Sequence, residues 1–518
     1  MPEYIKALFV VLVIAAVVFR LAAPSLIDTT TTKRDYWRRA WVWVAATAAA
    51  FLARDYWVFA LITGLVMFFA GRKDRNPMAS YCLVLCAVPP LGTEISGFGI
   101  INYLFDLNYL RLLSLVILLP AAIGLLSARD QRLPGPKLPD ALLASYLALL
   151  FILTVLAVPF TTALRQGFYL FIDVWLVYYV ASRSIRDMSA FREVAAAFVL
   201  GAMIMAVIAI FEAGRGWLLY SSVESSLGVV WGYGNYMARE VGGPLRAMAS
   251  TGHPIVMGYL MIVAIALLMF LRPAVHSRFI WGLSLSVLVG ALVVTLSRGP
   301  WIGAVAMAVV MSGIGKGAAK RFAKIGLGAS VASGLALMSE WGRGLIDHLP
   351  FIGTVGAETV DYRQQLFDVS IHVLSYSPFF GAPGFYNSAA AQQLRQGEGF
   401  IDMVNSYLGI AMGSGVVGLL LFIGFFWAAT WLAWKARRFT DEEPAALDFS
   451  RAVVASVVGI AITIGTTSSI NVIPAIYFLV AGLAVGCGGA LLAGVQTWPS
   501  AAAVDPAFRP RSPVASAR

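Results

Sequence analysis

The sequence predicts an all-α polytopic integral membrane protein with about 14–15 transmembrane helices and a large outer loop that carries short helices. Hydrophobic residues make up 59% of the chain, mean hydropathy is +0.80, and only 13% of residues are charged, against about 25% in soluble domains. Apolar stretches that approach the roughly 20 residues of a spanning helix recur almost from end to end. These observations exclude a soluble fold.

Apolar segments delimit the expected spans in order along the chain. The first is interpreted as a span rather than a signal peptide, because Glu3 beside Lys6 is atypical of a signal-peptide flank. The second and third meet at Arg54 and Asp55 as a tight hairpin of short or tilted helices. The run that begins at 404 is too long for one span, so its first turns stand above the bilayer. The segments are 5–22, 38–53, 56–71, 78–92, 109–127, 140–160, 167–182, 192–212, 254–271, 279–296, 300–315, 321–338, 404–434, 452–469 and 472–495.

Lysine and arginine are dense in alternate connections between these segments. The dense connections, such as 33–39, 72–75 and 316–324, are assigned to the cytoplasm by the positive-inside rule. This assignment places the N-terminus outside and the C-terminus inside. It also explains most of the net charge of +11, so nucleic-acid binding is not indicated. The three cysteines lie in apolar runs and are expected to be packing residues rather than disulfide or zinc partners: Cys82, Cys86 and Cys487.

Two outer connections are much longer than the others, which is typical of functional loops. They divide the chain into N-terminal helices at 1–212, an outer loop at 213–253, helices with a Ser-Arg-Gly turn at 254–338, a large outer (periplasmic) loop at 339–403, C-terminal helices at 404–495 and a tail at 496–518. The tail is rich in Pro, Ala, Ser and Arg, which predicts a disordered cytoplasmic segment.

Eleven arginines but only one lysine fall outside the dense connections. Arginine on the outer face opposes the positive-inside rule. Its planar guanidinium binds phosphate oxygens with two parallel hydrogen bonds and stays charged at any pH. Arg20 lies within the first span and is expected to snorkel inward. The full set is Lys6, Arg20, Arg54, Arg111, Arg165, Arg215, Arg239, Arg246, Arg298, Arg343, Arg363 and Arg395.

A tight outer turn carries Arg298. One span ends, Arg298 follows, and the next span starts at once; Gly299 permits an unusual turn and Pro300 suits a first helical position. The helix N-terminus adds positive potential there. The alternative interpretation is an arginine that snorkels at a hairpin tip.

The segment 242–254 is glycine-rich and enters the following span. It would hold Arg246 and His253 just above the bilayer. An ordinary entry loop is the alternative interpretation.

The large outer loop contains a helical stretch near 359–376 that ends before Pro378. Its polar residues recur with helical spacing, which places them on one face. That face either contacts substrate or is simply the solvent-exposed side of the helix. They are Asp361, Gln365, Asp368 and His372.

Four pieces in this order resemble the O-antigen ligase and O-antigen polymerase superfamily, and among its members the exopolysaccharide polymerases most. The similarity covers about 240–430. The pieces are Ser297-Arg298-Gly299-Pro300-Trp301; Arg363-Gln364-Gln365-Leu366-Phe367; Pro378-Phe379-Phe380-Gly381-Ala382-Pro383-Gly384; and Asn405-Ser406-Tyr407-Leu408 followed by Gly415-Val416-Val417-Gly418-Leu419.

The resemblance implies a GT-C-like glycosyltransferase that moves a glycan from a polyprenyl (undecaprenyl) diphosphate to an acceptor hydroxyl on the outer face of the bacterial cytoplasmic membrane. Departure of the lipid diphosphate develops negative charge that a cation must stabilise. The chain has no Asp-x-Asp pair and no His/Cys cluster of ligand spacing, so a metal-independent, inverting reaction without a cofactor is expected.

Roles follow from that chemistry. Arg298 and Arg363, with Arg246, are expected to hold the diphosphate. Asp402 and Asp368 rank above Asp361 and Glu398 as groups that orient or deprotonate the acceptor hydroxyl. Contacts to substrate are expected from Arg246, His253, His372, Asn405 and Tyr407.

Two other functions are alternatives for a membrane protein of this kind. A transporter or flippase would place ionisable groups near the bilayer midplane and show internal repeats, and the sequence shows neither. A ligase that attaches glycan to lipid A core or protein is the nearer alternative. However, the histidine that often precedes the asparagine of the last motif in the superfamily is Val404 here, which favours a polymerase. A chain-length regulator and a flippase are the expected partners.

Overall fold

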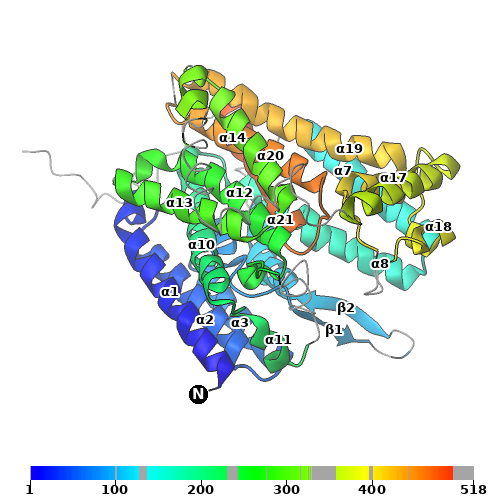
Figure 1. Cartoon of the computed structure of the whole chain (residues 1–518), viewed down its shortest axis with the longest axis horizontal. Helices are drawn as coiled ribbons and strands as arrows, with labels where there is room; N and C mark the ends of the chain where they lie inside the picture. Colours follow the sequence, from blue (N-terminus) through cyan, green and yellow to red (C-terminus); the bar gives the residue numbers. More distant parts are fainter. Residues whose placement is uncertain are drawn as a thin grey trace, which may run out of the picture.

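The computed structural model describes residues 2–97, 99, 102–127, 137–229, 243–275, 277–315, 317–324, 326, 328, 358–395, 401–441 and 443–493. Helices dominate this part of the chain (Figure 1). They are α1 Glu3–Leu26, α2 Lys33–Leu52, α3 Tyr56–Gly71, α4 Pro77–Val84, α5 Tyr109–Leu113, α6 Leu119–Ser127, α7 Lys137–Ala157, α8 Phe160–Tyr169, α9 Leu176–Ser184, α10 Met188–Arg215, α11 Ser221–Leu227, α12 Pro254–Phe270, α13 Arg278–Val294, α14 Arg298–Gly313, α17 Glu358–Tyr376, α18 Ala389–Gln392, α19 Ser406–Ala436, α20 Ala446–Ile464 and α21 Ile473–Leu492.

Seven helical segments in the described residues are long and apolar enough to cross a membrane, and α3, α12 and α13 are shorter apolar helices. Two expected spans consist of two helices joined by a π-helical turn, at Ser114–Leu118 and Leu170–Trp175. The expected all-α polytopic membrane fold is thereby confirmed. The predicted span at 321–338 lies mostly outside the described residues, as do the tail at 496–518 and Glu398.

Side-chain caps mark where many helices begin. Asp55 accepts hydrogen bonds from the backbone N–H groups of Trp57 and Val58, so the predicted hairpin turn between α2 and α3 doubles as a helix N-cap. Asn76 and His253 cap α4 and α12, and each is followed by proline at the first helical position, where its missing N–H group costs nothing.

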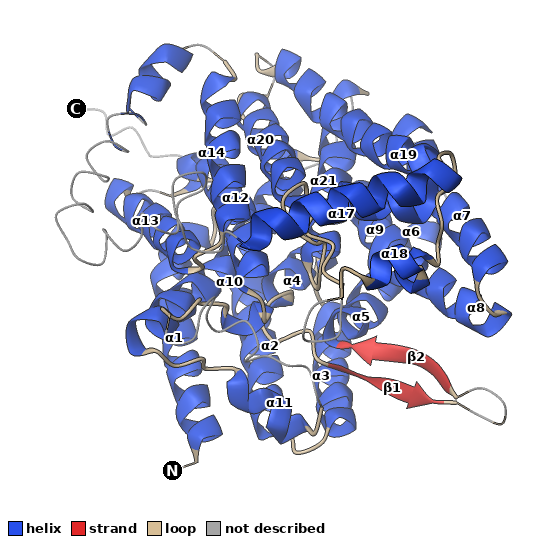
Figure 2. Cartoon of the chain, turned by 45° about the vertical axis from the view of Figure 1, so that its right-hand side comes forward, coloured by secondary structure: helices blue, strands red, loops and turns tan. Residues whose placement is uncertain are grey.

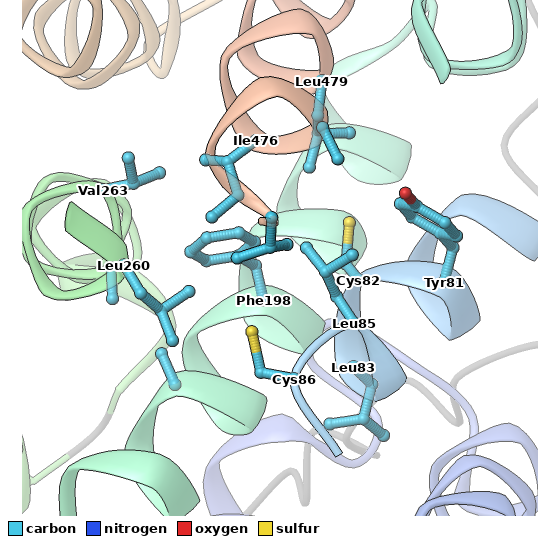
Figure 3. Close-up of a cluster of buried hydrophobic side chains, with 14 of the residues drawn as sticks. Tyr81, Cys82, Leu83, Leu85, Cys86, Phe198, Leu260, Val263, Ile476 and Leu479 are labelled. Carbon is cyan, nitrogen blue, oxygen red and sulfur yellow. The ribbon is translucent and has the colours of Figure 1, made fainter. Parts of the chain in front are cut away.

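The centre of the molecule is built around α10, α12 and α21, most of whose residues are buried. Side chains of α4, α10, α12 and α21 meet there in a continuous apolar cluster that includes Phe198, Leu260 and Ile476 (Figure 3). All three cysteines are free and buried, which confirms them as packing residues. By contrast, only 11% of the most apolar window of α7 is buried, as expected for a helix that faces lipid.

A two-stranded antiparallel hairpin, β1 Gly92–Ser96 and β2 Tyr103–Asn108, projects from the helical body beside α8 (Figure 2). The sequence pattern indicates only a connection between spans at these residues. The hairpin is held by backbone acceptors: Tyr56 Oη donates to Leu107 O at 2.6 Å, and Arg165 donates to the carbonyls of Tyr103 and Leu104 at 2.9 and 3.0 Å. Because every residue has a backbone carbonyl, hydrogen bonds of this kind do not select a residue type at the acceptor position and cannot be predicted from the sequence.

Long-range polar contacts sort into two groups that match the predicted alternation of connections. One group joins connections assigned to the cytoplasm: Arg39 pairs with Asp74 and Glu193, Arg183 with Asp140, and Arg451 donates to Ile314 O. The other joins connections assigned to the outside: Trp217 with Glu3, Arg165 with Tyr103 O, Arg246 with Ser297, and Arg363 with Thr466 O. The molecule therefore has two distinct polar ends.

Candidate functional site

The connection between α20 and α21, residues 465–472, joins most of the site residues and is called the hydroxyl loop here because it reads Gly-Thr-Thr-Ser-Ser-Ile-Asn-Val. Arg363 donates to Thr466 O at 3.0 Å, and Ser406 donates to Thr467 O at 2.9 Å. Asn471 Nδ2 lies 3.5 Å from Thr251 O. Segments that lie far apart in the sequence thus meet at this loop.

Arg298 is the first residue of α14, and the turn before it differs from expectation. Leu296, not Gly299, takes the left-handed conformation, with φ of 48°; Gly299 is helical. A Cβ at Gly299 would lie 2.6 Å from Thr466 Oγ1 and 2.7 Å from Thr467 Cγ2. Glycine is therefore needed for close approach to the hydroxyl loop, and the prediction of a glycine turn was wrong.

Arg246 and His253 are both buried, each 8% exposed. Arg246 Nη2 lies 3.1 Å from Ser297 Oγ and Nε 3.4 Å from Thr295 O, so Arg246 is fixed against the turn that carries Arg298. His253 Nδ1 accepts the backbone N–H of Ile255 at 3.1 Å. Burial, aided by the nearby Arg246 guanidinium, lowers the pKa of His253 to about 3. The imidazole is therefore neutral at physiological pH.

The outer-loop helix α17 brings Arg363 and its neighbour to the same place. Tyr362 Oη donates to Asp402 O at 2.9 Å. Partial burial and then the nearby Arg298 lower the pKa of Arg363, while Asp402 opposes the shift. Arg298, Arg363 and Asp402 are thus close enough for their charges to interact.

Asp402 lies in the segment between α18 and α19. Ser468 of the hydroxyl loop donates to its carboxylate and, at 3.0 Å, to Met403 O. Burial raises the pKa of Asp402, and the Ser468 hydrogen bond and Arg363 only partly offset this. A carboxylate with a raised pKa, hydrogen-bonded and next to arginine, is suited to accept a proton.

Asn405 and Tyr407 hold the start of α19 next to Asp402. Asn405 Oδ1 accepts the backbone N–H groups of Tyr407 and Leu408 at 3.0 and 3.3 Å. Tyr407 Oη donates to Ala461 O at 2.9 Å. Both side chains have partners within the protein, which gives them a positioning role, and their contact with substrate stays a prediction.

The polar stripe of α17 does share one face, as predicted, but that face is exposed. Asp361, Asp368 and His372 point away from the packed side, which is formed by Leu366 and Val373. Helical spacing alone does not decide which face docks. The structure therefore does not bring Asp368 or His372 together with the other candidates.

A cavity of ≈620 Å³ opens beside Asp402, within the range of about 300–1,000 Å³ that is typical of ligand sites. His253, Asp402, Ser406, Ser468 and Ser469 form its polar part. Its remaining walls are mostly apolar and come from α7, α19, α21 and the segment 383–386: Tyr146, Leu150, Ile410, Tyr477, Pro383 and Phe385 among them.

The strip 378–382 is inserted into a break in α19. Gly415 is non-helical there, with φ of 69°. The backbone N–H groups of Val416 and Val417 donate to Pro378 O and Phe379 O at 2.9 and 3.2 Å, and Ala382 N–H donates to Met412 O at 2.7 Å. The strip thus supplies hydrogen bonds that the broken helix lacks, and it fixes the adjoining cavity wall.

Sequence reasoning missed the hydroxyl loop and Glu212. Four consecutive hydroxyl residues between two apolar spans, at 466–469, were a usable signal for the loop. Glu212 is fully buried and accepts the backbone N–H groups of Leu219, Met248 and Ala249 at 2.9–3.2 Å, so it anchors the segment that carries Arg246. No local pattern distinguishes this glutamate.

Among the described residues, no group of three or more His, Cys, Asp or Glu side chains is placed to hold a metal ion. A search of curated proteins finds no match to the chain. A model of the O-antigen ligase family matches residues 283–423, a range that includes Arg298, Arg363, Asp402 and the break in α19. The protein is therefore a multi-pass helical membrane protein with a region, residues 283–423, that is similar to the O-antigen ligase family.

Proposed function

We propose that this protein polymerises polyprenyl-diphosphate-linked oligosaccharide repeat units into a surface or exopolysaccharide on the outer face of the bacterial cytoplasmic membrane. The family supports the coarser statement, a glycan-transferring membrane enzyme with a lipid-linked substrate. The observation that carries the proposal is the grouping of three arginines near Asp402, which lines the cavity: Arg246 is fixed to the Arg298 turn through Ser297, and the Arg363 charge interacts with those of Arg298 and Asp402.

The three arginines form the diphosphate site in this proposal. Arg246 is fixed to the Arg298 turn through Ser297, and Arg363 reaches the hydroxyl loop that packs on Gly299. A charge pair at about 4 Å is worth roughly 4 kcal/mol at an effective dielectric near 20. Two or three such pairs would supply much of a barrier reduction of about 8 kcal/mol or more.

Asp402 is the proposed general base. It would accept the proton of the acceptor hydroxyl as that oxygen attacks the anomeric carbon and the lipid diphosphate leaves. Direct displacement of this kind inverts the anomeric centre and needs no covalent enzyme intermediate. His253, which is neutral and lines the same cavity, is available to orient a sugar hydroxyl.

Replacement of Arg298 tests the proposal. Arg298→Ala should lower glycan transfer by at least about 100-fold, as for loss of a transition-state donor, without loss of folded protein. Arg298→Lys keeps the charge but not the paired donors, so it should recover only part of the activity. Arg395→Ala, which removes an exposed arginine of the same outer region, is the matched control. Full polymer length in Arg298→Ala would refute the diphosphate assignment.

Ligase-type transfer to lipid A core or protein is the second candidate, and the family match favours it as directly. Val404 stands where ligases often have histidine, and it is half-buried against the apolar cluster that includes Leu366 and Phe385. Deletion of the gene separates the two candidates. A polymerase mutant should accumulate single lipid-linked repeat units, whereas a ligase mutant should accumulate finished lipid-linked polymer.

A further inference from the structure

A second cavity, of ≈570 Å³, lies between the β1–β2 hairpin and the helices beneath it. Its walls come from both strands, from α5, from α8 and from the residues that follow α11. It is therefore at the same polar end as the diphosphate site, yet none of its lining residues lines the cavity beside Asp402. The side chains used below are Thr93, Glu94, Tyr103, Asp106, Arg111 and Tyr169.

Arg111 makes this cavity rigid. Its guanidinium lies 3.5 Å from the centroid of the Tyr169 ring. It donates to Asp106 Oδ2 and to Asp173 Oδ2, both at 3.0 Å. Tyr169 Oη in turn accepts the backbone N–H of Asp106 at 2.8 Å. A site held in this way is formed before any ligand arrives, which lowers the entropy lost on binding.

Carboxylates outnumber guanidinium groups around this cavity. Glu94 and Asp106 line the cavity with a single guanidinium, that of Arg111, which also pairs with Asp173; the Asp106 and Asp173 side chains stay 38% and 33% exposed. The Arg165 guanidinium already has partners within the protein. It donates to the carbonyls of Tyr103 and Leu104, and its Cζ lies 3.5 Å from the centroid of the Tyr103 ring. The charge balance is opposite to that of the arginine site, so this cavity does not suit a diphosphate.

Glu94 and Asp106 are directly opposite each other across the two strands. Like charges in such a pair are destabilising, and burial together with Glu94 raises the pKa of Asp106 against the pull of Arg111. A ligand that donates hydrogen bonds to both carboxylates would offset the repulsion between Glu94 and Asp106. Sugar hydroxyl and amino groups are donors of that kind, and ionised carboxylates only accept.

We propose that this hairpin cavity is a second saccharide-binding site, which takes a neutral or amino sugar of a glycan and holds it apart from the lipid diphosphate. Ionised carboxylates accept its hydroxyl protons, and the rings of Tyr103 and Tyr169 contribute apolar surface. The identity of this glycan as the enzyme's own acceptor or growing product rests on the proposed function. The existence of the saccharide site does not.

Binding to the purified full-length protein tests the site. The probe is the repeat-unit oligosaccharide released from the cell's own polysaccharide, free of lipid and phosphate, and affinity is measured by titration calorimetry. Glu94→Gln should weaken binding about tenfold, which corresponds to about 1.4 kcal/mol. Glu443→Gln removes a half-exposed carboxylate at the opposite polar end and should leave the affinity unchanged. Thr93→Arg, which fills the cavity with a long cationic side chain, should also abolish binding.

The outcomes separate this site from the diphosphate site. Arg298→Ala should lose glycan transfer but bind the free oligosaccharide as the wild type does, whereas Glu94→Gln should still transfer glycan but give shorter chains. Absence of oligosaccharide binding to the wild type, or unchanged affinity in both hairpin variants, would overturn the proposal. Retained transfer in Arg298→Ala would refute the diphosphate assignment and leave the hairpin result standing.

Discussion

At the scale of single residues, buried charge sets the properties of the candidate site. Asp402 has a raised pKa because it is buried, even though Ser468 and Arg363 favour its ionised form. His253 has a lowered pKa because it is buried beside Arg246. One carboxylate is thus a stronger base than usual, and one imidazole stays neutral.

Asp402→Asn should abolish glycan transfer and leave thermal stability unchanged or higher. The raised pKa means that the folded protein binds a proton at Asp402 more readily than the unfolded chain does. Its stabilising contribution is therefore present below the ordinary carboxyl pKa and is lost as pH rises through the raised value, and a neutral amide avoids that loss. Assays of transfer and thermal melting measure the two effects.

The pH profile provides the control for Asp402. Wild-type activity should rise with pH through a midpoint above about 4, the ordinary carboxyl value, because only the deprotonated base accepts a proton. Appreciable activity in Asp402→Asn would contradict its assignment as the base.

His253 should make the folded protein less stable in acid. An unfolded histidine binds a proton near pH 6.5, whereas folded His253 does so only near pH 3. Stability should therefore fall as pH drops through this interval. His253→Asn retains a capping side chain for α12 but does not titrate, so its melting temperature should depend less steeply on pH. Equal slopes in the two proteins would show that another group is responsible.

At the scale of elements, the break in α19 is the feature on which the cavity wall depends. Residues 416–436, on the C-terminal side of the break, would extend roughly 31 Å at 1.5 Å per residue, about the thickness of the hydrocarbon core. Residues 406–414 then stand beyond it, as the length of the apolar run predicted. The strip 378–382 occupies the junction between the two parts.

Gly415→Ala should displace the strip and lower activity. Its Cβ would lie 2.2 Å from the carbonyl of Phe379, and the backbone φ of 69° disfavours any side chain. The expected cost is about 1–3 kcal/mol or more, seen as a lower melting temperature. Gly424→Ala in the same helix is the control, because its Cβ would meet Leu142 at an ordinary 3.8 Å. Equal stability of the two variants would refute the role given to the break.

Sequence patterns found the elements better than they found the contacts between elements. Hydropathy located most of the described helices, and Pro378 correctly marked the end of α17. The run of hydroxyl residues at 466–469 was a usable signal for the hydroxyl loop, but the sequence could not reveal its partners, because Arg363 and Ser406 bind its backbone carbonyls. Asp368 and His372 were favoured because spacing defines a face but not its direction. Gly299 was misinterpreted because close packing and turn formation both select glycine.

At the scale of the whole molecule, the two polar ends agree with the alternation of lysine and arginine along the chain. Contacts link connections of the same predicted side, from Arg39 with Glu193 at one end to Arg363 with Thr466 at the other. The proposed orientation assigns the first end to the cytoplasm. Residues at the outer end should therefore be accessible to reagents outside the cell, and residues at the cytoplasmic end should not.

Thiol labelling in intact cells should reveal that orientation. The native cysteines are buried and should not react, so single cysteines can be introduced into the otherwise unchanged chain. Tyr376→Cys, at a position 78% exposed on α17, should react with a membrane-impermeant reagent. Asp441→Cys, exposed at the other end, should react only after permeabilisation. The reverse pattern would place the candidate site in the cytosol and end the proposed function.

The hydroxyl loop has an evolutionary consequence. The partners that reach Thr466 and Thr467 bind their main-chain oxygens, which every amino acid possesses. Selection at Thr466 and Thr467 therefore acts on the path of the backbone more than on side-chain identity, whereas Ser468 is constrained by the hydrogen bond of its hydroxyl group to Asp402. The family match ends at residue 423, before this loop begins. Divergent relatives should share the backbone path of this loop while differing in residue identity at positions 466 and 467. Superposed structures should therefore reveal the relationship better than aligned sequences.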